Sequence, residues 1–320
     1  MEKIGFIGLG NMGQGMSKNI QKAGYPMVVF DTRKDAEKDL VSKGAQSAKS
    51  PAEVAKLCDI VFTSLPGPVE VEAVALGDEG LVNGIHKGSI YIDLSTNRPS
   101  LLRKIAQVFG EKGAAVLDGP VSGGVPGANS GILAIMVGGD KQVFEKIKPV
   151  LNSFGNNVVY CGIVGSGNIC KVGHNMASIV LQQALAEALT MGVKAGVEPQ
   201  ALWDCMRKGA LGRNTVLHQR VPESLFRDKF DPPKFALALA TKDVKIATEV
   251  GRENNVPMPM ANLVEQLMVE GLNRGWGNKD NPVFMKLQEE AAGVQVRIPL
   301  TDEDLKKAAK LVIFNPDADK

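Results

Sequence analysis

The sequence predicts an α/β fold in which a doubly wound, mostly parallel sheet is followed by an all-α second domain with a long interdomain helix. Three observations predict it. Short apolar runs alternate with helical patterns over the first half, a glycine-rich turn follows the first run, and a proline-free apolar segment opens the second half. At 320 residues the chain is long enough for two domains, since single cores rarely exceed about 250–300 residues.

The sheet is predicted from runs rich in β-branched and apolar residues. They cover residues 3–7, 27–31, 60–65, 89–94 and 115–118, and two further runs at 132–137 and 157–161 complete the sheet near residue 162. Ligands of such sheets bind just beyond the carboxyl ends of the parallel strands. The functional loops are therefore expected at residues 8–13, 65–68, 95–97 and 119–124.

The second half of the chain is predicted to be helical. Residues 168–195 contain no proline and carry apolar side chains on nearly every face, which predicts one long buried helix ending at Gly196. Shorter helices follow from Pro199 to about Gln295. A last helix is expected within residues 297–320, where Thr301 and Asp304 form a capping-box pattern. The predicted domains are residues 1–164, residues 165–296 and a tail helix at 297–320.

Composition and charge exclude several classes of protein. The chain has 37 basic and 35 acidic side chains, a formal charge of +2, which argues against a nucleic-acid-binding protein. No apolar run approaches about 18 residues, and the first strand begins too early for a signal peptide to precede it. We therefore expect a cytoplasmic protein with no membrane partner.

The few cysteines and histidines argue against a metal site or a disulfide framework. Four cysteines are scattered without paired spacing, and three histidines are present. A structural metal site needs such ligands at close, regular spacing. We expect reduced thiols and no bound metal.

The glycine-rich turn is the strongest single motif. It comprises Gly8, Leu9, Gly10, Asn11, Met12 and Gly13, directly after the first predicted strand and before a helical pattern that runs to Ala23. The first glycine permits a tight turn, the second lets backbone approach a pyrophosphate, and the third allows close packing of helix and strand. The helix N-terminus then faces the phosphate charge. The motif predicts a Rossmann-type dinucleotide-binding domain.

Asp31 bears on the choice between NAD and NADP. It ends the second predicted strand, about 20 residues after the glycines, where a carboxylate accepts hydrogen bonds from the adenine ribose hydroxyls. A carboxylate there repels a 2′-phosphate, so Asp31 favours NAD. Arg33 and Lys34 follow directly and are cations that could reach such a phosphate, which keeps NADP as the alternative.

Two polar clusters are candidates for substrate binding and catalysis. Residues 118–124 follow a strand and offer glycine N–H groups beside the Ser122 hydroxyl, a nest suited to a carboxylate. Lys171, His174 and Asn175 stand at i, i+3 and i+4, so they share one face of the long helix. Because burying an unpaired ammonium is costly, this face is expected to line a cleft.

With these motifs the sequence resembles the β-hydroxyacid dehydrogenase family typified by 3-hydroxyisobutyrate dehydrogenase. The resemblance rests on residues 5–13, 118–124 and 165–175 and on Lys242 with Asp243, in family order. It implies that Lys171 is the catalytic lysine that exchanges the hydroxyl proton during hydride transfer to or from NAD(P). It further implies the remaining site residues. Substrate would contact Ser122, Gly123, Gly124, His174, Asn175 and Lys242, and the cofactor would contact Leu65, Pro66, Thr96 and Lys242 beside the glycine turn, Asp31 and Arg33.

The resemblance leaves two alternatives open. His174 stands where the family's hydroxyisobutyrate enzymes typically have asparagine, and a lysine followed by His-Asn is typical of 6-phosphogluconate dehydrogenases. The Ile-Glu-Tyr that usually follows there is replaced by residues 176–178, so a short decarboxylating enzyme is the second interpretation. A nucleotide-sensing protein without catalysis is the third. The expected partner is a small 3-hydroxy acid or its semialdehyde, and the long apolar helix predicts a homo-oligomer, a dimer or tetramer.

Overall fold

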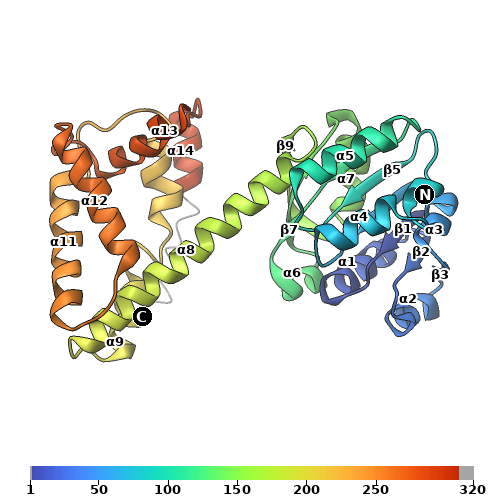
Figure 1. Cartoon of the computed structure of the whole chain (residues 1–320), viewed down its shortest axis with the longest axis horizontal. Helices are drawn as coiled ribbons and strands as arrows, with labels where there is room; N and C mark the ends of the chain where they lie inside the picture. The colour runs from blue at the N-terminus through green and yellow to red at the C-terminus, as the bar shows by residue number, and fades with distance from the viewer. Residues whose placement is uncertain (1, 310–320) are drawn as a thin grey trace. The chain divides into compact units, whose positions relative to one another are not determined.

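The computed structural model describes residues 2–309, and it divides into two compact units, Met1–Ala177 and Ser178–Lys320. Figure 1 shows the first as a sheet between helices and the second as helices alone. The division falls inside helix α8 (Ser166–Lys194), whereas the sequence analysis put it at the start of that helix. The first turn of α8 packs on the sheet, so its beginning belongs to the first unit.

The first unit is a nine-stranded sheet with seven helices. The strands are β1 (Ile4–Ile7), β2 (Met27–Phe30), β3 (Gln46–Ser47), β4 (Ile60–Thr63), β5 (Ile90–Asp93), β6 (Ala115–Asp118), β7 (Val121–Ser122), β8 (Leu133–Gly138) and β9 (Gly155–Gly162). The helices are α1 (Asn11–Lys22), α2 (Lys38–Ser42), α3 (Pro51–Leu57), α4 (Pro68–Leu76), α5 (Pro99–Gly110), α6 (Gly124–Ser130) and α7 (Lys141–Leu151).

The strand order β3-β2-β1-β4-β5-β6-β8-β7 confirms a doubly wound sheet. The neighbours from β3 to β6 are parallel, β6 and β7 run antiparallel to β8, and β9 pairs in parallel with β8. The order reverses between β1 and β4, which is where such sheets open a crevice for ligands. All seven predicted strands are present, and two two-residue strands, β3 and β7, were not predicted.

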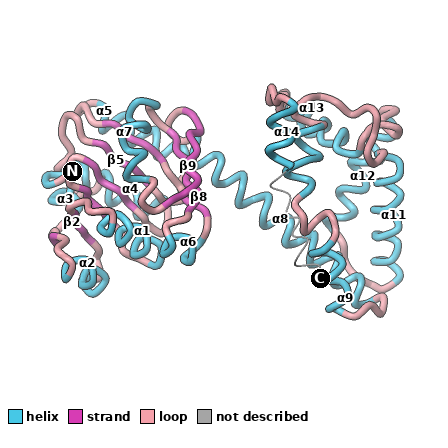
Figure 2. Tube along the Cα trace, turned by 180° about the vertical axis from the view of Figure 1, so that it is seen from behind, coloured by secondary structure: helices cyan, strands magenta, loops and turns pink. Residues whose placement is uncertain are grey.

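The central strands β1, β4 and β5 are buried on both faces, which explains their continuous apolar sequences. One face packs on α1, α6 and α7 through residues such as Met16 and Phe144, and the other on α3, α4 and α5 through Val54 and Ile105. Within one strand, neighbours divide between the faces: Phe62 lies in the first core and Val61 in the second. Figure 2 shows the strands as the central layer of this unit.

The second unit holds the rest of α8 and a set of shorter helices. They are α9 (Pro199–Lys208), α10 (Val221–Glu223), α11 (Leu237–Glu253), α12 (Pro259–Asn273), α13 (Lys286–Ala292) and α14 (Asp302–Ala309). Its core gathers Leu225, Phe230, Leu237, Met268 and Val283. This confirms the all-α second domain.

The expectation that α8 is buried all round is wrong for the single chain. Its apolar side chains at Ile169, Met176, Ile179 and Leu181 are exposed, with 63% of Ile179 accessible. Among the described residues, α8 is the one helix that is long and apolar enough to cross a membrane. The core helix of a soluble protein can have the same length and composition.

The tail shows the predicted cap. The Thr301 hydroxyl accepts the Asp304 N–H at 3.2 Å, and the Asp304 carboxylate accepts the Thr301 N–H at 2.9 Å, which confirms the capping box at the start of α14. An ion pair of 3.0 Å joins Arg227 to Asp302. The rest of the predicted tail helix, residues 310–320, lies outside the described residues.

Candidate functional site

The glycine turn sits at the point where the strand order reverses. Gly8 has φ +89°, and a Cβ there would stand 2.9 Å from Leu65 Cδ2 and overlap the Ser64 carbonyl oxygen. A Cβ on Gly13 would overlap the Gly8 carbonyl oxygen, so the third glycine lets α1 approach β1. The backbone requirements of the motif at these two positions are therefore met.

Gly10 differs from the other two glycines because its missing side chain leaves open space. A Cβ there would have one neighbour within 4 Å, Arg33 Nη2 at 4.0 Å. Gly10 also caps α1 without a side-chain hydrogen bond, and no acidic residue lies in the first turn. An anion could thus approach the backbone at the positive end of α1, which fits a pyrophosphate.

A cleft of about 660 Å³ lies over this turn. It is lined by most of the residues predicted for the cofactor: Gly8, Gly10, Asn11, Met12, Gly13, Asp31, Arg33, Leu65 and Pro66. Leu9 is buried beneath it, Thr96 is exposed and is not part of its wall, and Lys242 belongs to the second unit. Thr32, Ser64 and Glu70 also line the cleft and were not predicted, since they belong to no motif.

Asp31 is held in the cleft by backbone amides. One oxygen accepts the Leu9 N–H at 2.7 Å, and the other accepts the Arg33 N–H at 2.8 Å and lies 3.4 Å from Arg33 Nε. Burial raises the pKa of Asp31, but the hydrogen bonds from Arg33 and Leu9 lower it by more, so the net pKa lies below its ordinary value. The carboxylate is therefore ionised at neutral pH.

The predicted substrate loop follows β6. Gly123 and Gly124 have φ of +133° and +62°, and they connect β7 to α6. Ser122 is half-buried, while both glycines are exposed. The two glycines at this exposed turn can present backbone N–H groups to an anion, as in a nest.

Lys171 lies in the second turn of α8 and is buried, with 9% of its surface accessible. Burial lowers the pKa of its ammonium, and no carboxylate pairs with it among the described residues. His174 is exposed and Asn175 half-buried on the same face, with His174 Nδ1 and Asn175 Oδ1 3.2 Å apart. A buried amine with a lowered pKa is suited to proton exchange near neutral pH.

The start of α8 is anchored by Asp118, which belongs to the predicted cluster at residues 118–124 but was given no role of its own there. Asp118, the last residue of β6, accepts the Gly165 and Asn168 N–H groups, each at 2.7 Å. A Cβ on Gly167 would stand 2.9 Å from the same carboxylate, so that glycine permits the close approach. Burial raises the pKa of Asp118, and the hydrogen bonds from Gly165 and Asn168 act against the rise.

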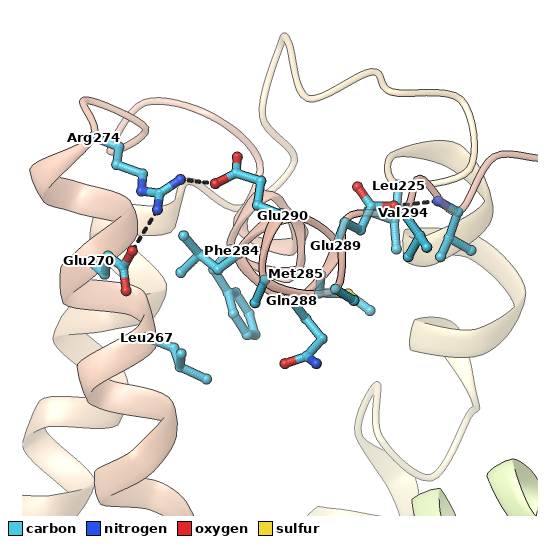
Figure 3. Close-up of a pocket in the computed structure, with 14 residues that line it drawn as sticks. Leu225, Leu267, Glu270, Arg274, Phe284, Met285, Gln288, Glu289, Glu290 and Val294 are labelled. Atoms are coloured by element: carbon cyan, nitrogen blue, oxygen red, sulfur yellow. Dashed lines mark hydrogen bonds and ion pairs between the residues drawn. The ribbon is translucent and has the colours of Figure 1, made fainter.

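A second cavity, of about 670 Å³, lies within the helical unit (Figure 3). Its wall is largely apolar, with Leu267 on α12 and with Phe284 and Met285 in the turn that precedes α13. Its arginine is paired: Arg274 binds Glu270 at 2.7 Å and also Glu290. None of the predicted site residues lines this cavity. Among the described residues no group of histidine, cysteine, aspartate and glutamate could hold a metal ion.

Family models match both halves of the chain. Residues 3–162 match the NAD-binding domain of 6-phosphogluconate dehydrogenase, and residues 165–287 match the NAD-binding model of NADP-dependent 3-hydroxyisobutyrate dehydrogenase.

Relatives of known activity cover nearly all of the chain. The 2-(hydroxymethyl)glutarate dehydrogenase of Eubacterium barkeri is 38% identical over 92% of this chain and 97% of its own length. The NAD-dependent L-serine dehydrogenase of Pseudomonas aeruginosa is 36% identical over 92% and 100%. A solved Mycobacterium tuberculosis 3-hydroxyisobutyrate dehydrogenase with L-serine superposes with a TM-score of 0.62 at 29% identity, covering 90% of this chain and 99% of its own.

Proposed function

This chain belongs to the β-hydroxyacid dehydrogenase family, and we propose that it oxidises a small 3-hydroxy acid, or reduces the corresponding semialdehyde, with NAD and with Lys171 as general base and acid. The observation that carries the proposal is the buried Lys171 amine, which has no carboxylate partner among the described residues. It shares its unit with the cleft over the glycine turn.

The names of the relatives narrow the substrate class. Hydroxyisobutyrate, serine and 2-(hydroxymethyl)glutarate all contain a primary alcohol on the carbon next to an α-carbon that bears the carboxylate. They differ in the α-substituent, which is methyl, ammonium or carboxyethyl. We therefore propose a 3-hydroxypropanoate with one α-substituent as the substrate.

The roles of the residues follow from this fragment. The carboxylate binds the nest at Ser122, Gly123 and Gly124, which offers N–H groups and a hydroxyl. The hydroxyl faces Lys171, whose neutral Nζ takes its proton in oxidation and whose ammonium returns it in reduction. Asn175 orients the substrate from the same helix face, and Lys242 is assigned to the nicotinamide side. The bound nicotinamide supplies the hydride chemistry.

NAD is favoured over NADP by Asp31. Its carboxylate is ionised, and it lines the cleft where the adenine ribose is expected. A 2′-phosphate would lie against this negative charge, while Arg33 is partly engaged by it at 3.4 Å.

The test combines a substrate panel with a variant. Wild-type protein is assayed with 3-hydroxypropanoates bearing hydrogen, methyl, ammonium or carboxyethyl at the α-carbon, each with NAD and NADP, and with 6-phosphogluconate while carbon dioxide is monitored. Lys171→Ala should fold, bind NADH and lose about 10²–10⁴-fold in kcat, the usual contribution of a general acid or base. Lys112→Ala, an exposed lysine of the same unit, is the control. Near-normal turnover of Lys171→Ala would refute the mechanism, and carbon dioxide release from 6-phosphogluconate would favour the decarboxylating alternative.

A further inference from the structure

A hydrogen-bonded network of buried polar side chains connects the wall of the cofactor cleft to the helix that carries Lys171. Its members are Thr63, Asp93, Ser95, Asn97, Asp118 and Asn168, each less than 5% exposed. They come from the carboxyl ends of β4, β5 and β6 and from the first turn of α8. Buried polar groups are costly unless paired, so a continuous set of them in one place calls for an explanation.

The network of polar side chains begins at the cleft. Leu65, which lines the cleft, donates its N–H to Ser95 Oγ at 2.9 Å. The Ser95 N–H and the Thr63 hydroxyl donate to one oxygen of Asp93, at 3.1 and 3.0 Å, and Asn97 Nδ2 donates to the other at 3.0 Å. Asp93 therefore holds together the loops that follow β4 and β5.

The network of polar side chains ends at α8. The Asn97 N–H donates to Asn168 Oδ1 at 2.6 Å, and the Asn168 N–H and Nδ2 donate to Asp118 Oδ2 at 2.7 and 3.4 Å. Asn168 is thus fixed from two sides, by the loop after β5 and by the residue that precedes the substrate loop. Lys171 stands three residues later on the same face of the helix.

We propose that Asn168 is a positioning residue, which fixes Lys171 relative to the loop after β5 through Asn97 and relative to the substrate loop through Asp118. The inference rests on the proposed role of Lys171. A helix turn held only by its own backbone bonds tolerates small shifts, and a displacement of about 1 Å at a reacting group can cost about 10²-fold in rate. Asn168 removes that freedom, because its amide reaches both loops at once.

The first experiment compares Asn168→Ala with Asn152→Ala, which removes an exposed asparagine from the same unit. Asn168→Ala should lower kcat by about 10–100-fold, while the Kd for NADH stays within about twofold of wild type. The half-labelling pH of the Lys171 amine with acetic anhydride, followed by peptide mass spectrometry, should rise toward that of a free lysine, because the amine is less well enclosed. A kcat and a labelling pH equal to those of Asn152→Ala would overturn the proposal.

Asn168→Asp keeps the shape and provides a test that does not depend on the alanine variant folding. Ionised, the new carboxyl would repel Asp118; protonated, it would again donate to Asp118 and accept from Asn97. The ratio of its kcat to that of wild type should therefore rise as pH falls, at temperatures well below its unfolding midpoint. Asp118, Asp93 and Lys171 are the charged groups that bear on this titration. A ratio independent of pH would contradict the proposal.

The outcomes separate the two proposals. If Lys171→Ala is inactive but both Asn168 variants behave like the control, the positioning role fails and the mechanism stands. If Lys171→Ala keeps its turnover, the mechanism fails, and the labelling pH still reports whether Asn168 holds the amine in place.

Discussion

Replacing Asp31 by asparagine should shift the cofactor preference from NAD toward NADP. The ribose 2′-phosphate carries about −1.5 to −2 charges. Each unit of negative charge on that phosphate, placed about 4 Å from the Asp31 carboxylate, would be repelled by about 4 kcal/mol at an effective dielectric constant near 20. Because Arg33 Nε lies 3.4 Å from the same carboxylate, part of this field is already neutralised. We expect about 3 kcal/mol of the discrimination to disappear, which is about 10²-fold in the ratio of the two Kd values.

Asparagine is chosen because it can still accept the Leu9 N–H, which is 2.7 Å from the carboxylate in the folded chain. Removing that acceptor altogether would leave a buried donor unpaired, which costs about 1–3 kcal/mol of folding stability. A change in cofactor affinity could then not be separated from the loss of stability. NADH and NADPH affinities are measured by fluorescence titration, with Asp39→Asn, a half-buried acid outside the cleft wall, as the control. A Kd ratio that stays within about threefold of wild type would refute the electrostatic explanation.

Three further predictions follow from the same structure. Gly13→Ala should destabilise the protein by about 3 kcal/mol or more because its Cβ would overlap the Gly8 carbonyl oxygen, whereas Gly110→Ala, with open space around it, should be neutral or slightly stabilising; urea unfolding measures both. Oxidation should speed up as pH rises toward the pKa of Lys171, which lies below 10.5, because the neutral amine is the base, and reduction should slow over the same range; parallel pH profiles in the two directions would contradict this. The exposed apolar side chains of α8 predict a dimer or tetramer by light scattering, and a monomer at micromolar concentration would contradict it.

The sheet was predictable because its central strands are buried on both faces and so appear as continuous apolar runs. β3 and β7 were missed because two residues carry no periodicity. The burial of α8 was overstated for a related reason. An apolar helix sequence indicates that burying the helix surface is favourable, but it does not show that residues of the same chain cover that surface. Residues such as Ile179 and Met176 are apolar and exposed in the single chain.

The cofactor cleft was predictable because its residues lie in two short motifs, the glycine turn and the strand that ends at Asp31. Each has a backbone reason that spacing alone expresses. Ser64 and Glu70 line the same cleft but belong to no pattern: Ser64 directly follows β4, and Glu70 lies in the first turn of α4. Only the fold places them.

The anchoring of α8 could not be predicted for a different reason. Asp118 contacts residues 47 and 50 positions away, and Asn97 and Asn168 are 71 positions apart. Nothing local distinguishes Asn168 from an ordinary polar residue near a helix start, because its two partners, one in the loop after β5 and one at the end of β6, are far away in the sequence. Its burial does distinguish it, since an amide at 0% exposure between two loops must be paired on both sides to be tolerated. Under the mechanism proposed above, the motif around Lys171 supplies both the amine that exchanges the proton and, one turn earlier, the amide that positions that amine.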